Sequence, residues 1–295
     1  TKEYDDNEEN EMAVKVKESK EKEAIFLDEV NAKFKGPGMH IMFGTNQRDG
    51  LPVVWEPNNT DVLFHTNMGI IGTMGTGKTQ FTKSLITQLY RDQSKNVGGE
   101  PLGILIFDYK GDYNESKKDF MEATHASILK PYQIPFNPLA IIKSKVFKPL
   151  LPVHIANAFK DTISKVYGLG PKQQDTLFQC IIETYNMCGI LAENPNSWEH
   201  EAPTFEQVYQ RYSNNEGIKK NDSLAAAMNK LQQFHIFEAV PSKTKSLFEI
   251  LKGVVVIDLS GYDTDIQNLI VAITLDLFYA QMQAVGSSKL DGKYR

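Results

Sequence analysis

The hydrophobic positions of this chain follow two periods, and the period changes at about residue 149. Before that residue, short apolar runs bounded by turn residues predict strands, and these lie at 39–43, 51–55, 62–65 and 102–108. From about 149 to 250 the apolar residues recur every three to four positions, which is typical of amphipathic helices. A continuous apolar run at 253–258 predicts another buried strand, and a long helix follows it. Apolar strands that alternate with helices predict an α/β fold with a mostly parallel sheet and a helical insertion.

The same pattern divides the chain into four predicted parts. These are a charged linker with a lead-in helix (1–38), a first part of the core (39–148), a helical insertion (149–250) and a second part of the core (251–295). Residues 1–11 hold six acids and one lysine, so the formal net charge of −5 comes from this end and the remainder is close to neutral. Bulk charge therefore neither favours nor opposes nucleic acid, and any DNA-binding surface has to be local.

Composition and targeting signals narrow the class of protein. The chain is 41% hydrophobic and 23% charged, as in ordinary globular domains, and no apolar run reaches the ~20 residues of a membrane span. No signal-peptide pattern is visible. The two cysteines, Cys180 and Cys188, lie on one predicted helix about 12 Å apart, too far for a disulfide. These features predict a cytoplasmic protein with reduced thiols and no membrane contact.

The most specific pattern in the chain is the run at residues 72–79. It reads Gly-Thr-Met-Gly-Thr-Gly-Lys-Thr and matches G-x-x-x-x-G-K-T, the Walker A phosphate-binding loop. A strand-like segment precedes it at 67–71, and apolar residues at helical spacing follow it at 81–90. A loop between a strand and a helix places backbone N–H groups and the positive end of the helix dipole around phosphate groups. The sequence therefore predicts a site for a nucleoside triphosphate.

The residue types in this phosphate loop have expected roles. Lys78 is expected to contact the β- and γ-phosphates and to act in catalysis, and the Thr79 hydroxyl is expected to ligate Mg²⁺. ATP and Mg²⁺ are therefore the expected cofactors. The predicted nucleotide-binding residues are Gly72, Thr73, Met74, Gly75, Thr76, Gly77, Lys78, Thr79 and Gln80.

Hydrolysis of the nucleotide needs a carboxylate at the end of a neighbouring strand. Two apolar strands end in aspartate, at Asp108 and Asp258, and neither aspartate is followed by glutamate. In one interpretation Asp108 is the Walker B aspartate and a candidate catalytic residue, with Asp112 or Glu115 near the attacking water. In the other, both strands are structural neighbours of a Walker B strand that lies beyond Arg295.

Three further motifs follow the phosphate loop in order. They are Asp-Tyr-Lys-Gly-Asp-Tyr at 108–113, Ile-Pro-Phe-Asn-Pro-Leu at 134–139 and Val-Val-Val-Ile-Asp-Leu-Ser-Gly at 254–261. Over about residues 39–284 the set resembles the HerA/FtsK branch of P-loop ATPases, which are hexameric DNA-pumping motors. Tyr109 stands where that branch commonly has proline. The resemblance implies a RecA-like core, ATP-driven movement of double-stranded DNA and a homo-oligomeric ring.

Within this branch the motifs look most like the ATPase module of restriction factors in DNA phosphorothioation systems. That resemblance implies a role in host defence, with other restriction-system subunits as partners. It also implies an Asp-Glu strand, a glutamine sensor and an arginine finger, none of which matches in this chain. We therefore expect the chain to bind ATP with Mg²⁺ but to hydrolyse it poorly. A nucleotide-binding scaffold that does not hydrolyse, and a small-molecule P-loop kinase that uses Asp108, stay open as alternatives.

Few other side chains suggest a functional role. Arg211 in the helical region is the best candidate in the chain for an arginine finger, whereas Arg91 at the end of the helix after the phosphate loop suits a structural role. Three lysines at 143–148 either face DNA or are simply solvated. Trp55 and Tyr109 either stack on adenine or pack in the core.

Overall fold

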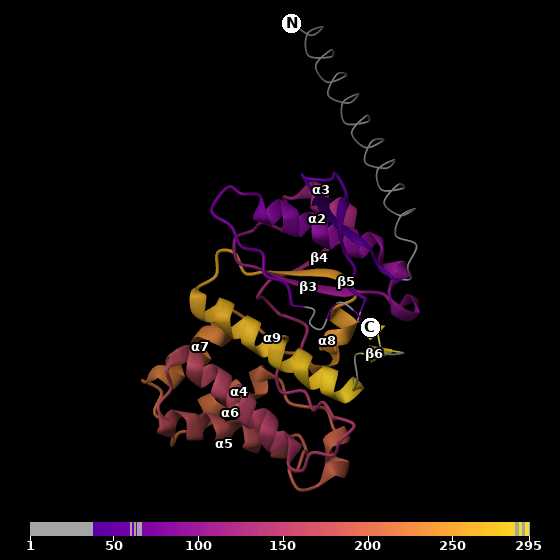
Figure 1. Ribbon diagram of the computed structural model, residues 1–295. Coiled ribbons are helices and arrows are strands. Elements are labelled where there is room, and N and C mark those ends of the chain that lie inside the picture. The colour runs from indigo at the N-terminus through magenta and orange to yellow at the C-terminus, as the bar shows by residue number, and fades with distance from the viewer. Residues whose placement is uncertain are drawn as a thin grey trace, which may run out of the picture. The chain divides into compact units, whose positions relative to one another are not determined.

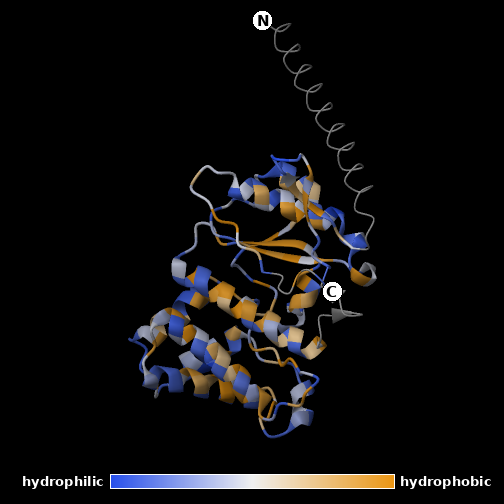
Figure 2. Cartoon of the chain, in the orientation of Figure 1, coloured by the Kyte–Doolittle hydropathy of each residue, from blue (hydrophilic) through white to orange (hydrophobic). Residues whose placement is uncertain are grey.

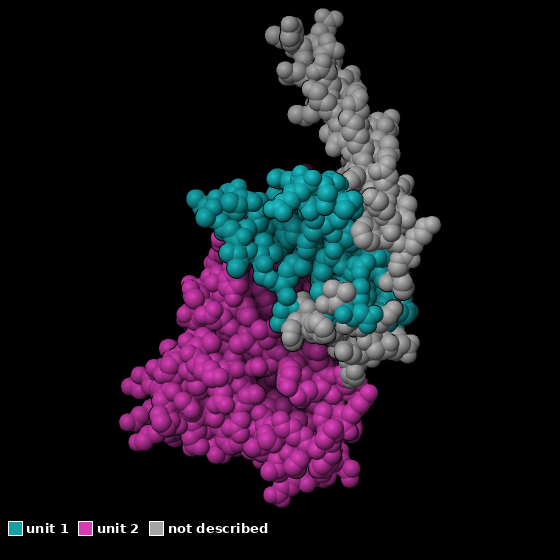
Figure 3. Space-filling model, in the orientation of Figure 1, with its two compact units in different colours: residues 1–100, 290–295 teal, residues 101–289 magenta. Residues whose placement is uncertain are grey.

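The computed structural model describes residues 38–59, 61, 63, 67–286, 289–290 and 293–294. The chain forms two compact units, residues 1–100 with 290–295 and residues 101–289 (Figure 3). The predicted linker and lead-in helix at 1–37, and most of the predicted strand at 62–65, lie outside the described residues. The predicted assignment of residues 39–148 and 251–295 to an ATPase core, and of residues 149–250 to a helical insertion, stays a prediction.

The first unit contains a β-hairpin and the helix that follows the phosphate loop. Strands β1 (Ile41–Thr45) and β2 (Pro52–Trp55) pair antiparallel, joined by the turn that the sequence predicts at 46–50. Helix α2 (Lys78–Arg91) and two 3₁₀ turns, Gln93–Lys95 and Val97–Gly99, follow. Two-residue strands β6 (Lys289–Leu290) and β7 (Lys293–Tyr294) lie at the other end of the chain. The predicted hairpin and helix are therefore confirmed, with bounds shifted by up to three residues.

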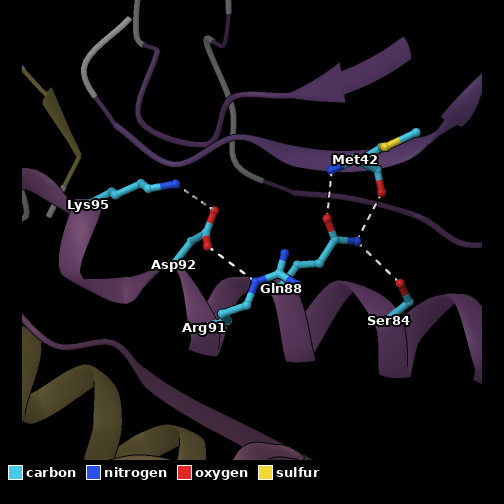
Figure 4. Close-up of polar contacts among 6 residues, drawn as sticks. All are labelled: Met42, Ser84, Gln88, Arg91, Asp92 and Lys95. Carbon is cyan, nitrogen blue, oxygen red and sulfur yellow. Dashed lines mark hydrogen bonds and ion pairs between the residues drawn. The ribbon is translucent and has the colours of Figure 1, made fainter. Parts of the chain in front are cut away.

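The side chain of Gln88 fastens the hairpin to α2 (Figure 4). Its Oε1 accepts a hydrogen bond from the N–H of Met42 at 2.8 Å, and its Nε2 donates to the Met42 carbonyl at 3.0 Å and to Ser84 Oγ at 3.2 Å. Met42 lies next to an irregularity in the β1–β2 register. Because backbone polar groups need partners when they are taken out of water, Gln88 supplies the two hydrogen bonds that a neighbouring strand would otherwise supply.

The end of α2 carries a small charge cluster (Figure 4). Asp92 faces two cations, with Arg91 Nε at 3.4 Å from Oδ1 and Lys95 Nζ at 3.3 Å from Oδ2. Arg91 lies in the last turn of α2, where a positive charge interacts favourably with the helix dipole. This placement agrees with the structural role that the sequence favours for Arg91.

The second unit is built on a three-stranded parallel sheet in the order β3–β5–β4 (Figure 1). The strands are β3 (Gly103–Asp108), β4 (Ser127–Leu129) and β5 (Gly253–Asp258), and β3 and β5 are strongly apolar (Figure 2). The sequence predicts that β3 is buried on both faces, and this is wrong. Central β5 is buried throughout after Gly253, whereas residues 104–107 of β3 are only partly buried, because β3 lies at an edge of the sheet that the described residues form.

Helices account for most of the regular structure in the rest of the second unit, which confirms the change of period near residue 149. They are α3 (Lys118–Thr124), α4 (Leu151–Tyr167), α5 (Pro171–Met187), α6 (Phe205–Asn214), α7 (Ser223–Gln233), α8 (Leu247–Ile250) and α9 (Thr264–Val285). Two local sequence features explain where helices begin: proline suits the first position of a helix, and Pro171 opens α5, while a Thr-x-x-Gln pattern forms a capping box, and the N–H of Thr204, before α6, donates to Gln207 Oε1 at 2.9 Å. Figure 1 shows α9 between the sheet and the group formed by α4, α5 and α6.

Helix α9 is the one helix, among the described residues, whose length and apolar composition would allow it to cross a membrane. A helix in a protein core meets the same criterion. One face of α9 is buried, including Ile266, Leu269, Ile270 and Ile273, and the helix packs against α4 and α8. Its apolar character is therefore explained in part by the core of the second unit.

Both cysteines are free thiols. Cys180 lies in α5, and burial raises the pKa of its thiol to about 11. Burial also raises the pKa of Cys188, which caps the same helix. Both thiols are therefore protonated near neutral pH and pack as small apolar groups.

We expect Gln88→Ala to lower the free energy of unfolding of the first unit by about 1–2 kcal/mol, because it leaves the N–H and carbonyl of Met42 without partners. Urea unfolding measures this change. Ser84→Ala is the matched control, since it removes only a contact between the two side chains and should cost less than about 0.5 kcal/mol. Equal effects of the two substitutions would contradict this role of Gln88.

Candidate nucleotide-binding site

The phosphate loop is exposed and leads directly into the first turn of α2. Gly77 caps the helix with φ of 83°, and Gly75 has φ of 82°. Both values lie in the left-handed region, which glycine adopts without strain. At Gly72 a Cβ atom would lie 2.6 Å from Thr76 Oγ1. All three glycines of the motif are therefore required by the backbone path or by close packing.

The loop offers backbone donors to an anion. Among the described residues, the N–H groups of Gly75, Gly77 and Lys78 have no hydrogen-bond partner, and the N–H of Thr76 makes only a 3.5 Å bond to the Thr73 carbonyl. The first N–H groups of a helix have no carbonyl partner within the helix, and the helix dipole adds partial positive charge there. This arrangement is suited to phosphate oxygens.

The side chain of Lys78 folds back over the loop. Its Nζ donates a hydrogen bond to the Thr73 carbonyl at 2.6 Å, and Thr76 Oγ1 donates to the same carbonyl at 2.8 Å. The ammonium group is thus already held at the loop. Because a phosphate oxygen is a stronger acceptor for an ammonium than a neutral carbonyl is, a bound nucleotide is expected to draw Lys78 away from Thr73.

The magnesium ligand that the sequence predicts is Thr79. Thr79 is partly buried in the first turn of α2, and Gln80 beside it is exposed. In the part of the chain that the structure describes, no three His, Cys, Asp or Glu side chains come together to hold a metal on their own. Mg²⁺ commonly uses one or two protein oxygens together with phosphates and water. The Thr79 hydroxyl is the oxygen that the sequence predicts for this role, and its binding of Mg²⁺ stays a prediction.

The segment before the loop differs from its prediction. The sequence predicts a strand at 67–71, and the structure shows none: no described residue pairs with this segment, and the side chain of Ile71 is 96% exposed. A strand is stable only where another strand takes up its N–H and carbonyl groups. Among the described residues no strand lies beside residues 67–71, so the apolar pattern alone did not determine the structure of this segment.

Asp108 ends β3 and shapes the loop that follows. Its carboxylate is buried, and Oδ1 accepts hydrogen bonds from the N–H groups of Lys110 (3.2 Å), Gly111 (2.9 Å) and Asp112 (3.1 Å). Oδ2 accepts from the N–H of Tyr113 at 2.8 Å. Four backbone donors thus surround one carboxylate. This hydrogen bonding favours the interpretation in which β3 is a structural strand, and a catalytic role for Asp108 stays a prediction.

Asp258 lies next to Asp108 at the carboxyl edge of the sheet. The β3–β5 register pairs the two residues, and the N–H of Leu259 donates to the Asp108 carbonyl at 2.9 Å. Asp258 Oδ1 accepts from the N–H and from the hydroxyl of Ser260, at 3.0 and 2.5 Å. Ligands in open α/β sheets bind at this edge. The phosphate loop and this edge belong to different compact units.

The Asn-Pro motif at 134–139 holds parts of the second unit together. Buried Asn137 donates from Nδ2 to the Pro203 carbonyl at 3.0 Å, and its Oδ1 accepts from the N–H of Leu139 at 2.9 Å. The Tyr185 hydroxyl donates to the Leu139 carbonyl at 2.6 Å. The motif therefore connects its loop to α5 and to the segment before α6, which is a structural role.

The basic candidates are dispersed. Arg211 Nε donates to Glu183 Oε2 at 2.6 Å, which links α6 to α5 and raises the pKa of Arg211; its role as an arginine finger stays a prediction. The lysines at 143–148 have different surroundings. Lys143 pairs with Glu199, whereas Lys148 lines a cavity of about 280 Å³ between its own loop, α4 and α9.

A family model described as the central domain of the helicase HerA matches residues 42–278. The chain belongs to this family. It is a P-loop module of the HerA/FtsK type, and the predicted α/β, RecA-like fold is confirmed.

One solved structure supports the fold of this HerA-family chain. The VirB4 protein of Thermoanaerobacter pseudethanolicus is similar, with a TM-score of 0.55 and 16% sequence identity over 84% of this chain. The chain spans 65% of that VirB4 chain. No curated protein matches the sequence.

If Asp108 shapes its loop, Asp108→Asn should expose the amides of residues 110–113 to solvent exchange and lower stability by about 1–3 kcal/mol. The reason is that the Asn Nδ2 group would face the Tyr113 N–H, donor to donor. Hydrogen exchange at these amides measures the effect, with exposed Glu115→Gln as control. Unchanged exchange in Asp108→Asn, combined with a loss of Mg²⁺-dependent nucleotide binding, would instead support a metal-binding role.

Proposed function

We propose that this HerA-family chain binds ATP with Mg²⁺ at residues 72–79 and Gln80, as the ATPase module of a DNA translocase. The observation that carries the proposal is the set of N–H groups at Gly75, Gly77 and Lys78 that have no hydrogen-bond partner among the described residues, together with the Lys78 ammonium, which is bonded to the Thr73 carbonyl of the same loop. A flexible triphosphate with high negative charge is the ligand that this arrangement fits best.

Each part of the loop has a definite task in this proposal. The N–H groups of residues 75–78 surround the phosphates, Lys78 stabilises charge on the β- and γ-phosphates, and the Thr79 hydroxyl ligates the Mg²⁺ that bridges them. The carboxylate oxygens of Asp108 accept hydrogen bonds from four N–H groups of the loop that follows β3. Activation of the attacking water therefore depends on groups other than Asp108, and hydrolysis by this chain alone is slow.

The family supports the wider setting of the proposal. Its model is named for a helicase, which favours double-stranded DNA as the polymer that is moved and a homo-oligomeric ring as the working assembly. We place this module in the cytoplasm. A role in phosphorothioation-dependent restriction, with other restriction-system subunits, rests on the motif resemblance alone, and co-purification with such subunits would test it.

Lys78→Ala should weaken binding of ATP with Mg²⁺ at least about tenfold, because it removes the only side-chain cation of the loop. Isothermal titration calorimetry measures the affinity. Lys83→Ala, which removes a lysine five residues further along α2, is the control and should retain the affinity of the unaltered chain. Thr79→Ala should bind ATP with little dependence on Mg²⁺. Unchanged binding in Lys78→Ala would refute the assigned site.

ATP hydrolysis with and without linear duplex DNA separates the functional classes. We expect binding that depends on Lys78 and a low rate of hydrolysis, which fits a module that works with further catalytic groups. A DNA-stimulated rate that Lys78→Ala abolishes would support the translocase and show that the chain holds a complete catalytic set. Tight binding without hydrolysis even in the assembled ring would favour the nucleotide-binding scaffold.

A further inference from the structure

An aromatic cluster lies against the helix that begins at the phosphate loop. It consists of Phe43 on β1, Trp55 at the end of β2 and Phe81 on α2. Phe43 stacks on Trp55 with ring centroids 6.1 Å apart and meets Phe81 edge to face at 5.1 Å. Phe81 is three residues after Lys78, so its Cα lies only about 4.5 Å further along the helix axis. The cluster and the phosphate loop belong to the same compact unit.

The three rings are only partly buried. Aromatic residues in the core of the second unit are much less exposed: Phe159, Phe205 and Phe237 pack together there and are 3–6% exposed. Core packing of aromatic residues normally removes their rings from water. The cluster in the first unit therefore keeps ring surface that a flat ligand can cover.

Trp55 also has an unused donor. Its indole N–H has no hydrogen-bond partner in the described part of the chain, whereas the indole N–H of Trp198 donates to the Leu191 carbonyl at 3.0 Å. A buried or partly buried indole usually finds an acceptor for this group. The nitrogen atoms of a purine ring or the oxygens of a ribose are acceptors of the kind that would fit.

The hydrogen bonds between Gln88 and the backbone of Met42 hold this cluster in place. By holding both backbone groups of Met42, Gln88 fixes β1 across α2, and the next residue, Phe43, is thereby directed at Phe81. The aromatic surface is thus attached to the same helix whose N-terminus faces the phosphates. A nucleotide that spans the loop and the cluster would contact a single rigid support.

We propose that the cluster of Phe43, Trp55 and Phe81 is the platform on which the base of the bound nucleotide stacks, with a purine as the preferred base. The proposal rests on the proposed function, because the phosphates have to occupy residues 72–79. Stacking on aromatic side chains tolerates different bases, and larger ring systems stack more strongly. The platform therefore gives affinity for the base, whereas the loop gives affinity for the triphosphate.

The test compares ATP with inorganic tripolyphosphate, both with Mg²⁺, by titration calorimetry on the full chain. We expect Trp55→Leu to weaken ATP binding about 5- to 10-fold and to leave tripolyphosphate binding unchanged. Trp55→Phe, which keeps a ring but removes the N–H, should show a smaller loss. Leu51→Ala alters an exposed residue of the same hairpin and should change neither affinity.

The following results would contradict the proposed stacking platform. Equal affinities of the unaltered chain for ATP and tripolyphosphate would show that the base is not bound. Weaker binding of both ligands in Trp55→Leu would show that the residue acts through the fold of the loop, and no change for either ligand would show that the base lies elsewhere. Failure of tripolyphosphate to bind the unaltered chain would refute the phosphate site itself, which is the proposed function.

Discussion

An α-helix cannot pair its own first N–H groups, and the candidate site in this chain depends on that constraint. At the start of α2 the constraint is strengthened, because Gly75 and Gly77 turn the backbone through left-handed conformations that direct successive N–H groups outward. A bulkier residue at Gly72 would meet Thr76. The loop therefore combines donors without partners and a backbone path open only to small residues, which is the physical basis of phosphate binding.

The rest of the first unit gives this helix terminus a rigid support. The hairpin is attached through the amide group of Gln88 and through rings that pack on the N-terminal half of α2. Both contacts lie on the helix that carries the loop. In the proposed complex, the groups that contact the phosphates and the groups that contact the base would therefore be attached to one helix.

In the second unit, carboxylates and amides organise the loops while apolar residues form the core. Asp108 gathers four N–H groups from its own loop, and Asn137 connects two distant loops in the interior. Because these polar side chains are buried, the fold is stable only if their polar atoms have hydrogen-bond partners. Motifs that are shared with a family of nucleotide-dependent motors can therefore have structural rather than catalytic reasons for their residues.

The sequence by itself determined the features whose causes are local. The glycines of the phosphate loop, Pro171 at the start of α5 and the pairing of Thr204 with Gln207 act within a few residues, so their patterns predicted their structures correctly. Tertiary structure decided the features that need a distant partner. Whether 67–71 becomes a strand, and whether β3 is central or at an edge, depends on which strands lie beside them, and a pattern of apolar residues does not specify that neighbour. The same holds for the aromatic cluster, because Phe43 and Phe81 are far apart in the sequence and meet where β1 packs on α2.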